Sequence, residues 1–238
     1  MTPSEWVDFY EASSMRIIKR ASDYLDKPVL CCPGWAGRDL LRHVAMTPAV
    51  WGTIMDTSPG DGFPTLDMER LNAELPSDDD ALAAWARAET TRYADRLRQR
   101  DPESWAFNVG PNTAAWMWMR RAAAETAVHL WDAETLGGPP SEVSPALAAD
   151  GLDELTEMIG NYLARTTSPV PAPVNAVAAD LDRAWTFAST AVPKAAIVQG
   201  SASDLFLRLW GRPAIRLSGA IDVLDEWARL PFAAPPQR

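Results

Sequence analysis

The feature that most constrains the fold is a series of long segments with helical spacing of apolar residues in the first 135 positions. Breaks rich in proline, glycine and aspartate separate these segments, and Gly-Gly-Pro-Pro at 137–140 ends the last of them. Ser4 and Ser77 are candidate N-caps. The predicted helices cover 4–25, 36–56, 78–100 and 113–135, with a surface loop at 57–77. Helices of about 20 residues joined by loops favour a four-helix bundle.

The rest of the chain has a different pattern. A further helical segment at 145–164 precedes a proline-rich stretch at 168–173, and shorter elements follow. Strands are predicted at 185–188, 195–198 and 214–217, and helices at 204–210, where Ser201 or Ser203 is the N-cap, and at 221–230. The predicted fold class is therefore α plus α/β. It comprises an N-terminal four-helix bundle at 1–144, followed by a linking helix and a small α+β C-terminal domain at 145–238.

Charge and hydropathy exclude several classes of partner. The net charge is −10, from 22 basic and 32 acidic residues, so phosphates of nucleic acid and anionic membrane surfaces would repel the chain. No apolar run approaches the roughly 18 residues that a transmembrane helix needs. The first 20 residues lack the basic start and apolar centre of a signal peptide. We therefore expect a cytoplasmic protein, monomeric or homodimeric, without nucleic acid or membrane partners.

The chain has only two histidines, His43 and His129, so any imidazole chemistry must use them. His43 shares one face of its predicted helix with Leu40, Val44, Thr47 and Trp51, and this face is apolar enough to point inward. Glu125 and His129 are four residues apart, so their side chains lie on one face of the last bundle helix. A buried carboxylate needs a partner, and a metal ion is one. His43, Glu125 and His129 are therefore candidate metal ligands.

The three candidate ligands indicate which kinds of metal site are possible. Three protein ligands leave one coordination position open, which is typical of catalytic zinc, but two imidazoles and a carboxylate also suit non-haem Fe(II). Asp132 follows His129 by three residues and is a candidate acceptor that orients the histidine ring. The alternative is a metal-free core, in which His129 bonds Glu125 and His43 is simply packed. Spacing leaves both interpretations open.

Three segments resemble motifs of one known family, the mycothiol-dependent maleylpyruvate isomerases. CPGWAGRDLLRHV at 32–44 is similar to the family signature CPGW-x-x-RDLL-x-H, and ETAVHLWD at 125–132 is similar to its E-x-x-x-H-x-x-D segment. GSASDLFLRLWGR at 200–212 resembles the motif of the family's second domain. The segments occur in the family's order and span most of the chain. The resemblance implies a DinB-like four-helix bundle that carries a small α/β C-terminal domain.

The resemblance also implies cofactors and roles. A divalent metal, usually zinc, would be held by the residues that match His43, Glu125 and His129, and mycothiol would be the thiol cofactor. An arginine of the C-terminal domain would meet the substrate; Arg212 is the candidate catalytic residue, with Arg208 and Arg216 as rivals. Only three of the 22 basic residues are lysines, a bias that indicates a GC-rich genome such as an actinomycete's. Such a source fits a mycothiol cofactor.

The chemistry implied is attack by a thiolate, because a bound metal lowers the pKa of a thiol. The leading hypothesis is a cis–trans isomerase that adds the thiolate to a small unsaturated or electrophilic acid. Alternatives are a mycothiol S-transferase, a noncatalytic module that binds a metal or a thiol conjugate, and a metal hydrolase in which water replaces the thiol.

Two other groups of residues have competing interpretations. Cys31 and Cys32 could supply an internal nucleophile, but we favour packing of Cys32 under Trp35, since the family resemblance implies an external thiol. Trp116 and Trp118 could line a substrate cavity, but core packing between the bundle and the second domain is the favoured interpretation.

Overall fold

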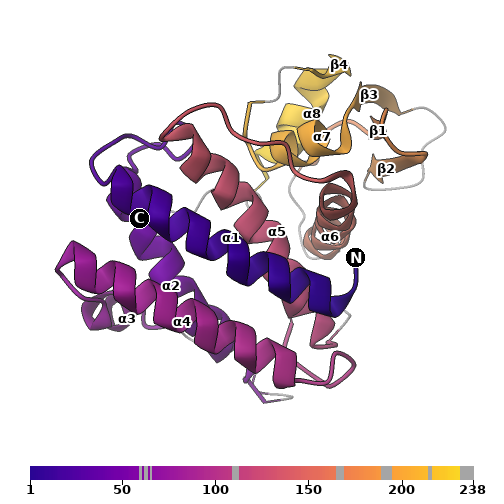
Figure 1. Cartoon of the computed structure of the whole chain (residues 1–238). Coiled ribbons are helices and arrows are strands. Elements are labelled where there is room, and N and C mark those ends of the chain that lie inside the picture. The colour runs from indigo at the N-terminus through magenta and orange to yellow at the C-terminus, as the bar shows by residue number, and fades with distance from the viewer. Residues whose placement is uncertain are drawn as a thin grey trace. The chain divides into compact units, whose positions relative to one another are not determined.

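A computed structural model describes residues 1–58, 61, 64, 66–108, 113–164, 169–188, 195–213 and 216–230 (Figure 1). The chain divides into two compact units, Met1–Ser141 and Glu142–Arg238. Within the described ranges, no helix combines the length and the apolar character needed to cross a membrane.

The first unit is a four-helix bundle, as predicted. Its long helices are α1 (Pro3–Asp23), α2 (Gly37–Met55), α4 (Asp79–Gln99) and α5 (Trp116–Thr135). The prediction of a loop throughout 57–77 is wrong, because a short helix, α3 (Met68–Glu74), lies within it. Asp67 caps α3 by accepting from the Arg70 N–H at 2.9 Å. Residues 59, 60, 62, 63 and 65 of the same stretch lie outside the described residues.

The helix starts differ slightly from the predicted ones. Thr2, not Ser4, caps α1: its hydroxyl accepts from the Glu5 N–H, while Glu5 accepts from the Thr2 N–H at 2.7 Å. This reciprocal capping box satisfies two backbone donors, and Pro3 suits the first helical position because it lacks the N–H. Asp78, not Ser77, caps α4. Asp39 lies in the first turn of α2 and accepts from the Ala36 N–H at 2.8 Å.

α1 is the helix around which the bundle packs. It contacts α5, α4 and α2, and Figure 1 shows α1 and α4 side by side. α2 packs mainly against α4. The core is aliphatic and closely packed, and its fully buried side chains include Ile17, Ile18, Leu40, Leu41, Leu82, Leu97 and Leu136.

Gly37 allows the start of α2 to approach the end of α1 closely. A Cβ at this position would lie 2.2 Å from the backbone oxygen of Tyr24, which cannot move away without shifting the chain. We expect Gly37→Ala to lower the free energy of unfolding by about 1–3 kcal/mol, the usual cost of overpacking. Gly138→Ala is the matched control, since its Cβ would meet nothing within 4 Å. Urea unfolding followed by circular dichroism measures both, and equal stabilities would contradict the prediction.

The second unit is a small α+β structure, as predicted. α6 (Pro145–Leu163) leads to a four-stranded sheet of order β2-β1-β3-β4. The strands are β1 (Val174–Ala178), β2 (Arg183–Phe187), β3 (Ala196–Gly200) and β4 (Ser218–Gly219). β1 pairs with β2 antiparallel and with β3 parallel, so Ala176 lies opposite both Trp185 and Val198. α7 (Ala202–Leu209) and α8 (Ile221–Ala228) complete the unit.

Strand prediction was less accurate than helix prediction. The strands predicted at 185–188 and 195–198 correspond to β2 and β3, whereas β1 was missed. Of the strand predicted at 214–217, residues 214 and 215 lie outside the described residues, and 216 and 217 are not in a strand. Ser201 caps α7, accepting from the Asp204 N–H at 3.0 Å.

Candidate metal centre

α2 and α5 bring the three predicted ligands together. His43 lies on α2, and Glu125 and His129 lie one turn apart on α5. Glu125 Oε1 is 3.5 Å from His43 Nε2 and 3.2 Å from His129 Nε2. The two imidazole rings meet edge to face with centroids 4.6 Å apart. Each side chain is at most 17% exposed, so the three groups face one another in a largely water-excluded position.

The separations of the three groups suit a small divalent ion. Bonds of about 2.0–2.2 Å in a tetrahedral site place neighbouring donor atoms roughly 3.4 Å apart. The distances from Glu125 Oε1 to the two Nε2 atoms bracket that value, and one donor atom from each residue lies within 4.8 Å of the others. The donor set is chemically suited to zinc and equally to Fe(II).

His129 has a carboxylate at each ring nitrogen. Its Nδ1 is 3.0 Å from Asp132 Oδ2, and its Nε2 is 3.2 Å from Glu125 Oε1. A neutral imidazole carries a single N–H and can donate to only one of them. When Nδ1 donates to the fully buried Asp132, the Nε2 lone pair faces Glu125. A cation held between that lone pair and the carboxylate relieves their repulsion, so the residues present fit a metal ion.

A narrow pocket opens beside these residues. Its volume is about 20 Å³, enough for a water-sized group. α1 contributes part of the wall, which the sequence interpretation missed. Tyr10, Ser14 and Ile17 were detectable as a stripe at i, i+4 and i+7 spacing. The pKa of Tyr10 is raised because burial disfavours the phenolate, so its hydroxyl stays protonated. The full lining is Tyr10, Ser14, Ile17, His43, Val44, Thr47, Trp51, Glu125, Thr126 and His129.

The loop before α2 covers the histidines. Gly34 takes a positive φ of 81° in this loop, a conformation that glycine adopts without steric cost. Trp35 then stacks on the His129 ring with centroids 6.2 Å apart and lies 5.2 Å from the His43 ring. An indole over two imidazoles restricts both water access and ring rotation.

Cys32 has a polar contact in addition to the expected packing. It is buried in the bundle core with Trp35 packed nearby, as favoured from the sequence. Its Sγ also lies 3.7 Å from Asp132 Oδ2. Cys32, His129 and Asp132 form a second group of potential ligands. Because Cys32 Sγ and His129 Nδ1 both lie within hydrogen-bond distance of Asp132 Oδ2, we interpret this group as a hydrogen-bonded support for His129.

The tryptophans at the start of α5 contact residues of the bundle itself. Trp116 stacks on Trp6 of α1 with centroids 6.1 Å apart. Trp118 is buried and donates from Nε1 to the Phe107 carbonyl at 2.8 Å. Its ring also lies 6.5 Å from that of Trp51, which lines the pocket. Trp118 therefore packs against a residue of the pocket wall.

The candidate arginines lie in the second unit, in three different environments. Arg212 is 3% exposed, and its Nη1 donates to the Trp210 carbonyl at 2.6 Å. Arg208 of α7 binds both carboxylate oxygens of Asp225 on α8. The Arg216 side chain is 61% exposed and pairs with Glu142. Of the three, Arg212 is the most deeply buried.

Comparisons with known proteins identify the family. The sequence profile of the mycothiol maleylpyruvate isomerase N-terminal domain matches residues 14–134, more than half of the chain. Crystal structures of the mycothiol-dependent maleylpyruvate isomerase and of its histidine-to-alanine variant each superpose with a TM-score of 0.65 at 14% identity, over 92% of this chain and 93% of theirs. That structural likeness shows a shared fold. The comparison with curated proteins found no match. The chain belongs to the mycothiol maleylpyruvate isomerase family.

Proposed function

We propose that the protein is a metal- and mycothiol-dependent enzyme that acts on a small unsaturated or electrophilic acid, with cis–trans isomerisation as its reaction. The observation that carries the proposal is the convergence of donor atoms from His43, Glu125 and His129. Family membership supports the thiol and the reaction class.

Each residue of the centre has a role in the proposal. His43, Glu125 and His129 would hold the divalent ion, with zinc as the first choice, and Asp132 would hold the proton on His129 Nδ1. When bound, the metal would lower the pKa of the thiol, and the thiolate would supply reversible addition to an activated double bond. Because both histidines of the chain are ligands, neither can serve as a separate general base. Proton transfer must then use a carboxylate, the thiol or water.

The reaction class is tested by incubating metal-loaded protein with mycothiol and maleylpyruvate. Isomer formation without net loss of thiol supports the proposal. Consumption of thiol with other electrophiles, in the absence of isomerisation, would assign S-transfer instead. Turnover that continues after all thiols are removed would indicate a hydrolase and contradict the proposal.

We also propose that Arg212 provides the cation for the substrate carboxylate or developing enolate. We expect Arg212→Lys to lower kcat/KM by about 10²–10³, the usual effect of losing one preorganised donor, while metal content and the thermal unfolding midpoint stay unchanged. A merely structural Arg212 would lower the unfolding midpoint instead.

The matched control for Arg212 is Arg216→Lys, since that side chain is largely exposed. If Arg216→Lys lowers kcat/KM and Arg212→Lys does not, the assignment to Arg212 is wrong.

A further inference from the structure

The two oxygens of Glu125 have different partners. Oε1 faces the Nε2 atoms of His43 and His129 at 3.5 and 3.2 Å. Oε2 is bound by Nη2 of Arg121, one helical turn earlier on α5. One oxygen of Glu125 is thus directed to the metal position and the other is directed away from it. The sequence interpretation identified Glu125 but not Arg121.

The Arg121–Glu125 pair is more covered than two other i,i+4 pairs of a lysine or arginine with a carboxylate. Its side chains are 18% and 17% exposed. The i,i+4 pair Lys19–Asp23 is 74% and 46% exposed, and Arg70–Glu74 is 74% and 48% exposed. Exposed pairs of this kind hold their side chains weakly because water competes for both charges. A largely covered guanidinium–carboxylate pair is stronger and more directional.

A carboxylate ligand binds a metal through one oxygen or through both. Two-oxygen binding by Glu125 would require Oε2 to leave Arg121 and turn toward the histidines. One-oxygen binding keeps the number of protein donor atoms at three, the number that leaves an open position for an exogenous ligand. The Arg121 guanidinium therefore influences whether the open coordination position stays available to an exogenous ligand.

We propose that Arg121 is a positioning residue that restricts Glu125 to one-oxygen coordination and so keeps a coordination position for the thiol. The inference rests on the proposed metal and thiol chemistry. Arginine suits this role because its planar group holds a fixed direction toward a carboxylate oxygen, whereas a lysine ammonium rotates freely and is strongly hydrated.

The test uses the full chain with cobalt(II) in place of the native metal, because cobalt d–d absorption weakens as coordination number rises. In Arg121→Ala, Glu125 is free to bind through both oxygens. We expect a weaker d–d band at saturating cobalt. We also expect the affinity for 2-mercaptoethanol to fall by about tenfold or more, as when other residues that support a metal ligand are lost. The thiolate-to-cobalt charge-transfer band measures this affinity. Arg121→Met gives the same test if the alanine variant does not fold.

Arg70→Ala is the matched control, since it removes an exposed i,i+4 pair and should leave both bands unchanged. An unchanged d–d band and thiol affinity in the Arg121 variants would overturn the inference. So would loss of cobalt binding in a folded variant, because the inference requires Glu125 to remain a ligand. If wild-type protein binds no cobalt, the proposed function itself fails, which separates the two failures.

Discussion

Replacing either His43 or His129 with alanine is expected to reduce metal content from about one ion per chain to nearly none. Each variant leaves only two donor residues, and the chain has no other histidine to substitute. The same loss is expected for His129 as for His43, although the His129 ring is also held by Asp132 and stacked on Trp35. Elemental analysis of protein purified with excess metal gives the stoichiometry directly.

The control for the histidine variants is Arg42→Ala, one position before His43 on α2, whose guanidinium donates to the Asn72 carbonyl instead. Helical circular dichroism should be retained in all three variants. If the metal stays bound at normal stoichiometry in both histidine variants, the proposed metal centre is wrong.

Replacing Asp132 with alanine is expected to weaken metal binding by about 10- to 100-fold without removing a ligand. Asp132 is fully buried, and its Oδ2 lies 3.0 Å from His129 Nδ1. Without this acceptor the ring can rotate or carry its proton on Nε2, where it would compete with the metal. Asp132→Asn keeps an acceptor oxygen and should restore part of the affinity. Competition with a chromogenic chelator measures all three affinities.

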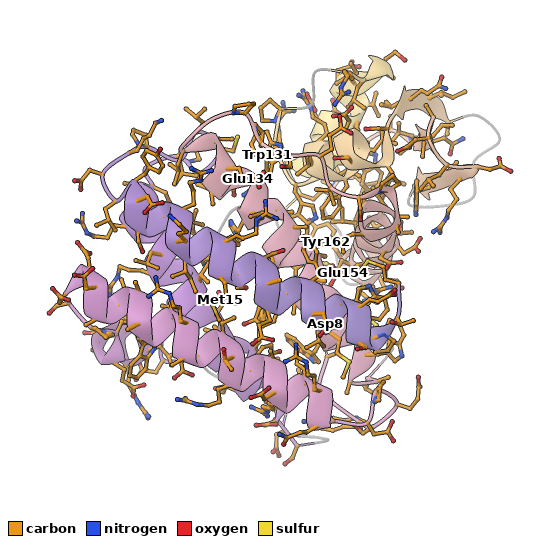
Figure 2. The ribbon with its side chains drawn as sticks, viewed as in Figure 1. Asp8, Met15, Trp131, Glu134, Glu154 and Tyr162 are labelled. Carbon is orange, nitrogen blue, oxygen red and sulfur yellow. The ribbon has the colours of Figure 1, made fainter. Side chains whose placement is uncertain are left out.

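Glu134→Ala provides the comparison for Asp132. Glu134 lies two residues further along α5 (Figure 2), has an 11% exposed side chain and pairs with Arg16 of α1 rather than with a histidine. Its loss should leave metal affinity unchanged. Equal affinities for Asp132→Ala and wild type, in proteins of the same fold, would show that Asp132 does not orient the ring.

Much of the bundle could be predicted from the sequence because each long helix buries a stripe of regular period. The stripe on α2 that contains Leu40 and Val44 indicated which way His43 faces. β1 was missed because Val174–Ala178 alternates buried and half-buried positions but consists mostly of small side chains. With two valines and no aromatic residue, its strand signal is weak, and its register depends on pairing with β2 and β3, which a local pattern does not contain.

The candidate centre was predictable to the extent that it is local to one helix. Glu125 and His129 are related by helical spacing alone, whereas Cys32 meets Asp132 across 100 residues of sequence. Arg121 carried a usable signal, since it is four residues before Glu125. A single arginine on a helix nevertheless resembles any solvated surface charge until its 18% exposure is known.

The placement of the candidate ligands on α2 and α5 has a consequence for folding. α5 packs chiefly against α1, and α2 packs chiefly against α4. The interface between α2 and α5 is therefore smaller than the α1–α5 and α2–α4 interfaces. An ion bound to His43 of α2 and to Glu125 and His129 of α5 would cross-link the two helices. Because such an ion binds only the assembled helices, the unfolding midpoint would rise with metal concentration. Metal depletion would then loosen the packing between α2 and α5 first.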